Sequence, residues 1–325
     1  MKSICELLSI KYPIIQGSMG NISQAALTAA VSEAGGLGTV GTGTMTPREV
    51  EAILLETKRK TSSPFAVHID FRVNPYVHDL IDLVLKYRVP VVSLPEGDHA
   101  QTLSLLHHYG IIVIAAVSSV KQAQKAEAAG AELLVAEGFE AAGMNSSHEM
   151  TTFTLIPQII SAVSIPVVAA GGIGDGKGLA AAFMLGAKGV QMGTRLIATK
   201  ESRVPNAYKE KLIQASGLDT QVIGRSVGRV KRVIKTGYAE KIVHAEKAGI
   251  GLEEFNQMTT EDKHMKGAVW GDVDNGLINC GQVAGLITSI PNVKELFANM
   301  MEEAVVQMNE VSHRMPLVGS KLIAR

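Results

Sequence analysis

The chain has 325 residues, which is enough for one large barrel or two ordinary domains. Lysine plus arginine and aspartate plus glutamate balance at 31 each, and this excludes the basic excess typical of proteins that bind nucleic acid or membrane surfaces. Only Cys5 and Cys280 are present, without Cys/His clustering, a secretory signal or an apolar run near the roughly 20 residues that span a bilayer, so we expect a cytoplasmic protein without a metal site.

Short apolar, β-branched runs recur along the first 192 residues and predict strands. There are eight of them, at residues 13–16, 36–41, 64–69, 90–94, 111–117, 132–137, 166–170 and 188–192. Their continuous apolarity indicates burial on both faces, as in a parallel sheet. Amphipathic stretches such as "TPREVEAILLETKRK" and "VKQAQKAEAAGA" lie between them and predict helices. Eight strand–helix units favour an α/β fold of the (β/α)8, or TIM, barrel type. A doubly wound sheet, which usually has fewer strands, is the alternative.

The composition changes after residue 195. Residues 200–265 are rich in Lys, Arg and Glu, show no strand pattern and predict helices with loops. Residues 281–313 return to an apolar helix and then an amphipathic one, "VKELFANMMEEAVVQMNEV". We therefore expect a barrel unit made of residues 1–199 plus 281–325. Residues 200–280 are expected to form a smaller helical lid.

The ends of the predicted strands carry the candidate site, because active sites of TIM barrels lie where strands pass into the following loops. These positions hold polar residues and glycines. In chain order they are Gln16, Gly17, Ser18, Met19, Gly41, Gly43, His68, Glu96, Glu137, Gly171, Gly172, Gly193 and Thr194.

Two neighbouring strand ends, in "PVVAAGGIGDGKG" and "GVQMGTR", stop at glycines. Phosphate sites in such barrels favour the loops after strands seven and eight. Residues 170–173, which begin at Ala170, and residues 193–195 would there offer backbone N–H groups and the Thr194 hydroxyl to one phosphate. The alternative is that these glycines only permit tight turns. The first strand end, "IIQGSMG", has room for a planar cofactor ring, although Met19 could equally belong to the core.

Several motifs together resemble one family. "YPIIQGSM", "SEAGGLGTVG", "AEGFEAAG", "IPVVAAGGIGDGKGLAAAFMLGAKGVQMGTR" and "GDVDNG…CGQVAGL" are similar to nitronate monooxygenases, also called 2-nitropropane dioxygenases, and enoyl-acyl-carrier-protein reductases II. The resemblance spans residues 1–290 and implies a TIM barrel that holds FMN noncovalently. "GDVDNG" is more like the reductase branch. The FMN contacts that it implies are Gly17, Ser18, Met19, Glu137, Gly171, Gly172, Gln191, Gly193 and Thr194. Gly41, His68 and Ala170 are expected at the same site.

The chain departs from the family pattern at two positions. His68 stands where the family often has Asn, and either side chain can hydrogen-bond a flavin edge. Met144 stands where related enzymes carry a His that is considered catalytic or substrate-orienting, and Met can neither accept nor donate a proton. His148, four residues later, is therefore a candidate substitute, with an exposed surface histidine as the alternative.

The resemblance implies an FMN-dependent oxidoreductase that oxidises alkyl nitronates with oxygen. One alternative is an enoyl-acyl-carrier-protein reductase II that uses NADH or NADPH, and a second is a flavin-binding protein with little turnover. A barrel of the IMP dehydrogenase type is disfavoured because it needs a loop cysteine, and neither cysteine lies at a strand end. Family members commonly self-associate, so we expect a homodimer, with "LFANMMEEAVVQM" as a possible interface.

Overall fold

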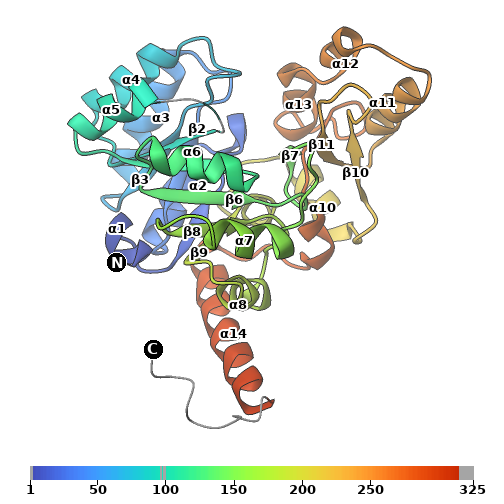
Figure 1. Cartoon of the computed structure of the whole chain (residues 1–325). Coiled ribbons are helices and arrows are strands. Elements are labelled where there is room, and N and C mark those ends of the chain that lie inside the picture. The colour runs from blue at the N-terminus through green and yellow to red at the C-terminus, as the bar shows by residue number, and fades with distance from the viewer. Residues whose placement is uncertain (1–2, 96, 98–99, 315–325) are drawn as a thin grey trace.

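The computed structural model describes residues 3–95, 97 and 100–314. An eight-stranded parallel sheet in the order β1-β9-β8-β6-β5-β4-β3-β2 forms the centre of the molecule (Figure 1). Its strands are β1 (Ile14–Gln16), β2 (Gly38–Gly41), β3 (Phe65–His68), β4 (Val91–Leu94), β5 (Ile112–Val117), β6 (Leu133–Glu137), β8 (Val167–Ala170) and β9 (Gly189–Met192). Each lies within one of the eight apolar runs, and the predicted barrel is confirmed.

The barrel is closed between β1 and β2 by a short contact. A parallel bridge joins Ile15 to Leu37, and the Gln16 N–H donates to the Leu37 carbonyl at 2.9 Å. The buried Gln16 side chain continues this ladder: its Nε2 donates to the Thr39 carbonyl at 3.0 Å, and its Oε1 accepts from the Thr39 N–H at 3.4 Å. A side-chain amide thus replaces backbone pairing where the two strands diverge.

Helices cover the outside of the barrel. They are α2 (Ala25–Glu33), α3 (Pro47–Lys60), α4 (Val77–Lys86), α5 (Ala100–His108), α6 (Val120–Ala128), α7 (Thr152–Ile160) and α8 (Gly176–Met184), while α1 (Ile4–Leu8) lies at one end of the barrel. In α3 the sequence sets the start directly: Thr46 and Glu49 form a capping box around Pro47, and Val50 and Leu54, one turn apart, are buried.

The strands are buried on both faces, as their continuous apolarity predicts. Val91 packs in the cluster inside the barrel with Ile15 and Val168, whereas its neighbour Val92 packs outward against the helices. Ile4 and Leu8 of α1 belong to the inner cluster, so α1 closes the barrel at the end opposite the strand-end loops.

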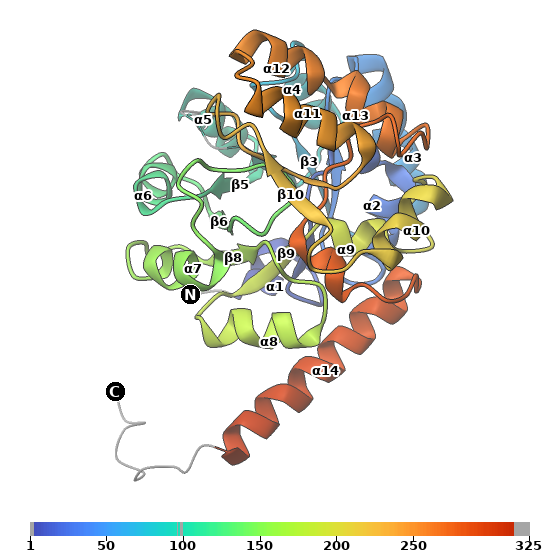
Figure 2. The same ribbon diagram turned by 90° about the vertical axis from the view of Figure 1, so that its right-hand side faces the viewer.

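The segment after the barrel is helical in part. Its elements are α10 (Asn206–Gln214), β10 (Thr220–Ile223), β11 (Lys231–Ile234), α11 (Gly237–Lys247), α12 (Leu252–Met258) and α13 (Glu261–Ala268). The expectation that it lacks strands is wrong: β10 and β11 pair with β7 (Gly143–Met144), from the loop after β6, in a three-stranded antiparallel sheet. Charged and polar residues fill half of these strands, which hides the strand pattern. In Figure 2 this segment lies toward the viewer, over the barrel.

The chain returns to the barrel through η2 (Gln282–Leu286), and the last element of the described residues is α14 (Val293–Arg314). The first half of α14 packs on α8, with Phe297 and Met300 buried. A Cβ at Gly176 would lie 2.5 Å from the Met300 carbonyl oxygen, so glycine is required for this close approach. The rest of α14 extends beyond α8 (Figures 1 and 2). None of the described helices is long and apolar enough to cross a membrane.

Candidate active site

A cavity of about 400 Å³ opens at the carboxyl ends of the barrel strands, between these ends and the segment after the barrel. This volume lies within the range of roughly 300–1,000 Å³ that is usual for small-molecule sites. The position agrees with the rule that such barrels place their chemistry at the ends of the strands.

Most of the predicted site residues meet in this cavity although they are far apart in the sequence. Those that line it are Gly17, Ser18, Met19, Gly43, His68, Glu137, Met144, Ala170, Gly171, Gly172, Gln191, Gly193 and Thr194. Gln16, Gly41 and His148 do not line it. Glu96 lies outside the described residues.

The turn after β8 requires glycine at both positions. Gly171 and Gly172 have φ values of 97° and 76°, in the left-handed region that side chains rarely adopt. A Cβ at Gly171 would lie 2.8 Å from the Gly138 carbonyl oxygen. The Thr152 hydroxyl lies 2.9 Å from the Gly171 carbonyl oxygen and 3.0 Å from a Glu140 carboxylate oxygen. The turns after β6 and β8 are therefore held against each other.

The same turns expose backbone donors to the cavity. No hydrogen bond within the described part of the chain takes up the N–H groups of Gly172, Ile173 or Gly193. The buried Thr194 hydroxyl accepts from the Gly281 N–H at 3.0 Å, which leaves its own hydrogen free to donate. Unpaired N–H groups beside a hydroxyl fit an anion such as phosphate.

The loop after β1 forms another wall of the cavity. The Gly17 N–H donates to the Met192 carbonyl at 2.8 Å, and the Met19 N–H donates to the Ser23 hydroxyl at 3.0 Å. A Cβ at Gly193 would lie 3.5 Å from the Met19 sulfur, so Met19 packs beside the predicted phosphate turn. Met19 also packs against the core, so both interpretations of this residue hold in part.

Glu137, the last residue of β6, brings a carboxyl group into the cavity. Burial raises its pKa to about 7, and the charge of Arg72 lowers the pKa by a smaller amount. Because desolvation disfavours the charged form, the carboxyl is close to half protonated at neutral pH and can donate or accept a hydrogen bond.

His68, at the end of β3, is a second half-buried titratable residue at the strand ends. Its Nδ1 lies 3.2 Å from the Ser93 hydroxyl. Burial lowers the pKa of His68 to about 4, so its ring is neutral at pH 7. A neutral imidazole offers one donor and one acceptor, which suits a cofactor edge better than a charge would.

Gly41 has a different place from the one predicted. It lies behind the loop after β1, where a Cβ would come within 2.4 Å of the Gly20 carbonyl oxygen. The glycine therefore allows this loop to pack against the end of β2, and the residue does not face the cavity.

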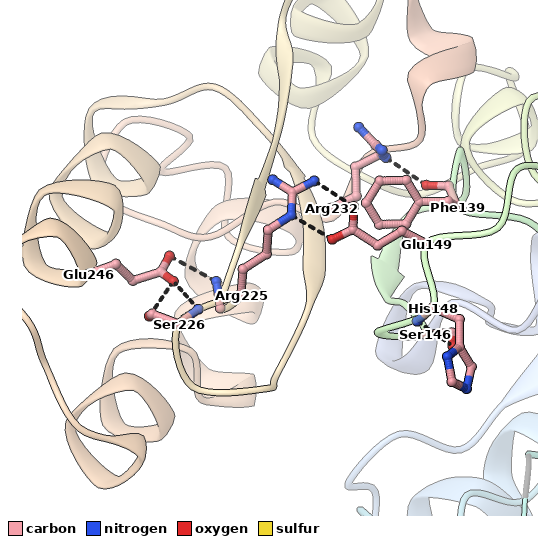
Figure 3. A network of polar contacts seen from close by, with 9 residues as sticks. Phe139, Ser146, His148, Glu149, Arg225, Ser226, Arg232 and Glu246 are labelled. Carbon is pink, nitrogen blue, oxygen red and sulfur yellow. Dashed lines mark hydrogen bonds and ion pairs between the residues drawn. The ribbon is translucent and has the colours of Figure 1, made fainter.

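The two predicted catalytic residues, Met144 and His148, differ in their placement relative to the cavity. Met144 is 44% exposed and lines the cavity. His148 is exposed outside the cavity, and its backbone N–H donates to the Ser146 hydroxyl at 3.2 Å (Figure 3). This placement agrees with the alternative of a surface histidine.

The loop that carries Met144 is fixed to the segment after the barrel. Arg225 forms two hydrogen bonds with the Glu149 carboxylate, and Arg232 Nε donates to the Phe139 carbonyl at 3.0 Å (Figure 3). Both guanidinium groups also lie over the Phe139 ring, at 5.6 and 4.7 Å from its centre. Together with the β7–β11 pairing, these contacts hold the loop after β6 in place.

The segment after the barrel contributes cavity residues that were missed from the sequence, among them Tyr208, Glu261, His264 and Asn279. They come from α10, α13 and the strand-like segment beyond, so no spacing along the chain connects them with the barrel mouth. A lone histidine in the helical pattern of 261–268 gave no signal of its own.

Comparison with known proteins adds independent information. The nitronate monooxygenase family matches residues 2–78 and 72–303. A Mycobacterium tuberculosis protein named (3aS,4S,5R,7aS)-5-hydroxy-7a-methyl-1-oxo-octahydro-1H-indene-4-carboxyl-CoA dehydrogenase is 32% identical, over 95% of this chain and 97% of its own. A probable nitronate monooxygenase of Staphylococcus saprophyticus is 34% identical over 73% and 79%. The structure of FabK from Thermotoga maritima, 38% identical, aligns with a TM-score of 0.90 over 97% and 100%.

Proposed function

Because the chain belongs to the nitronate monooxygenase family, we propose that it oxidises alkyl nitronates with oxygen and depends on FMN. It is an oxidoreductase, as are its named relatives, and the resemblance found in the sequence is confirmed. The observation that supports the proposal is the cavity at the strand ends. It brings the unpaired N–H groups of the glycine turns together with the side chains of Glu137 and His68, whose pKa values are shifted by burial.

The residues present fit FMN. The unpaired N–H groups of Gly172, Ile173 and Gly193 and the Thr194 hydroxyl would hold its phosphate. The residues around the rest of the cavity would contact the ring and the ribityl chain: Gly17, Ser18, Met19, His68, Glu137, Ala170, Gly171 and Gln191. When bound, FMN supplies the electron transfer, while the protein supplies binding, orientation and exclusion of water. Residues 200–280 serve as the lid.

Met144 supports a nitronate as the substrate, because this side chain cannot act as a base. A nitronate has already lost the α-proton of the parent nitroalkane, so an enzyme that takes the anion needs no base to remove it. Met144 fills the position of the family histidine and cannot move a proton. An oxidation that starts from the anion is compatible with this substitution.

The second candidate is reduction of an enoyl thioester with NADH or NADPH as reductant. The likeness to FabK at 38% identity over nearly the whole chain favours it, as does the relative named for a CoA ester. The third is a flavin-binding protein with little turnover.

Steady-state assays separate the three. We expect oxygen uptake with propyl-2-nitronate and no NADH-dependent loss of crotonyl-CoA. The reverse pattern would establish the reductase, and turnover of neither compound would leave the flavin-binding protein.

Restoring the family histidine is expected to extend the range of substrates. Met144→His places a group that can accept a proton at the exposed cavity position of Met144. We expect oxygen uptake with neutral nitroalkanes to rise by about 10²-fold, because general acid–base catalysis typically contributes 10²–10⁴-fold. His148→Ala, a change outside the cavity, is the control and should behave as the wild type. Unchanged nitroalkane turnover in Met144→His would contradict the assignment of this position.

We also propose a homodimer formed through α14. Its outer half presents Val305, Val306 and Val311 at 49%, 47% and 39% exposure, beyond the part that packs on α8. Light scattering at micromolar concentration should give twice the chain mass of 34.5 kDa. A monomer would contradict this, and Val306→Glu should shift the dimer toward monomer.

A cytoplasmic location is proposed on the state of the two cysteines. Cys5 and Cys280 are both free thiols, and free thiols are stable in the reducing cytoplasm.

A further inference from the structure

Residue His264 lies in the wall of the cavity that the lid provides. It belongs to α13, whose first turn also supplies Glu261, and both side chains line the cavity with Tyr208 and Asn279. His264 is 6% exposed. A helix of the lid thus places a buried imidazole against the space where substrate must lie.

The hydrogen bonding of this imidazole is incomplete. Neither ring nitrogen has a hydrogen-bond partner among the described residues. Nδ1 lies 3.5 Å from a Glu261 carboxylate oxygen, which orients the ring without a well-formed hydrogen bond. The same Glu261 oxygen accepts from Asn21 Nδ2 at 3.0 Å, so the carboxylate is itself held in place by the loop after β1.

A second unpaired atom lies in the same cavity wall. Asn279 Oδ1 is buried and has no partner within the described part of the chain. Buried polar groups are nearly always paired, and leaving them unpaired is costly. Unpaired atoms on two side chains of one cavity wall therefore point to a polar ligand that satisfies them when it binds.

We propose that His264 is a substrate-binding residue, whose imidazole donates a hydrogen bond to the oxygen of the substrate that carries negative charge. This inference rests on the proposed function. In a nitronate this oxygen belongs to the planar nitronate group, C=N(O)O⁻, and in an enoyl thioester it is the carbonyl oxygen that becomes negative during reduction. Even the neutral imidazole carries one N–H that can make this hydrogen bond. Solvent does not reach the ring nitrogens, so this role requires the imidazole to turn about its side-chain bonds toward the cavity when substrate binds.

The test compares three variants of the FMN-loaded protein. His264→Ala removes the donor, and His264→Gln keeps an N–H donor of similar reach. His244→Ala, an exposed change on α11 of the same lid, is the matched control. Two quantities are measured: the KM for propyl-2-nitronate, and the dissociation constant of butyrate from the change that it causes in the flavin spectrum. Butyrate is a planar anion like the nitronate and does not react, so its binding is a readout independent of turnover.

Loss of a hydrogen bond to a charged group should weaken binding about 10- to 100-fold. We expect this rise in both constants for His264→Ala, a smaller one for His264→Gln, and wild-type values for His244→Ala. Flavin content should stay unchanged in all three. If His264→Ala fails to fold, the smaller rise in both constants that is expected for His264→Gln tests the inference.

Each other outcome decides the inference. Wild-type constants in His264→Ala, with normal nitronate turnover, would overturn the role of His264 and leave the proposed function intact. A wild-type protein that ignores nitronate but reduces crotonyl-CoA, with weaker crotonyl-CoA binding in His264→Ala, would assign the residue to the thioester oxygen. A protein that turns over neither compound would overturn both proposals.

Discussion

The Gly171→Ala variant should lose nearly all of its FMN, whereas Gly110→Ala should keep it. Both glycines have positive φ, 97° and 68°, so both substitutions strain the backbone, by about 1–2 kcal/mol at Gly110 and by more at Gly171. They differ in what the new methyl group meets. At Gly171 it would lie 2.8 Å from the Gly138 carbonyl oxygen and 3.0 Å from the Thr152 hydroxyl, while at Gly110 nothing lies within 4 Å. Only the first change must displace the turn after β8.

This displacement would move the N–H groups of Gly172 and Ile173 away from the proposed phosphate site. We expect FMN affinity to fall by about 100-fold or more, because more than one charge-assisted hydrogen bond is lost. The measurement is the flavin content of each purified variant after dialysis, with thermal unfolding as a check of folding. Full flavin content in Gly171→Ala would remove the turn from the cofactor site.

Glu137→Gln should abolish a large pH dependence of stability in the flavin-free protein. Burial raises the pKa of Glu137 from 4.5 to about 7, so the folded state keeps a proton that the unfolded chain releases above pH 4.5. The protonated form therefore stabilises the fold fully below pH 4.5. This stability is lost as the pH rises through 7, by about 3 kcal/mol in total at 1.36 kcal/mol for each pKa unit.

Glu137→Gln has no ionisable side chain at this position, so its stability should not fall in this way as the pH rises. Urea unfolding at pH 4.5 and pH 8 should show the wild type falling by about 3 kcal/mol relative to Glu137→Gln. Glu253→Gln, an exposed change on α12, should follow the wild type. Parallel pH profiles for wild type and Glu137→Gln would show that the carboxyl is ionised in the folded state at neutral pH.

The barrel and most of its mouth could be predicted because local rules fix them. Apolar runs buried on both faces predicted all eight strands, and strand ends converge in any such barrel. The turn at Gly171 and Gly172 could also be predicted, because residues other than glycine rarely adopt the positive φ values that it needs. These features depend on residues close together in the sequence or on the general geometry of the fold.

The features that could not be predicted from the sequence depend on contacts between segments that are distant along the chain. β11 is stabilised by β7, nearly 90 residues earlier in the chain, and its own sequence "KRVI" is half charged. Gly41 was assigned to the cofactor from its place at a strand end, but it serves the packing of the loop after β1. His264 reaches the cavity only because the lid folds back over the barrel, whereas His148, close to the site in sequence, faces solvent.

The central claim is that this cavity holds FMN and that a nitronate transfers electrons to it. The most direct measurement is anaerobic mixing of the purified holoprotein with propyl-2-nitronate, followed through the visible absorbance of the flavin. We predict a rapid loss of oxidised-flavin absorbance with the nitronate, its return when oxygen is admitted, and no comparable change with NADH. An unchanged flavin spectrum with nitronate, together with rapid bleaching by NADH, would contradict the account.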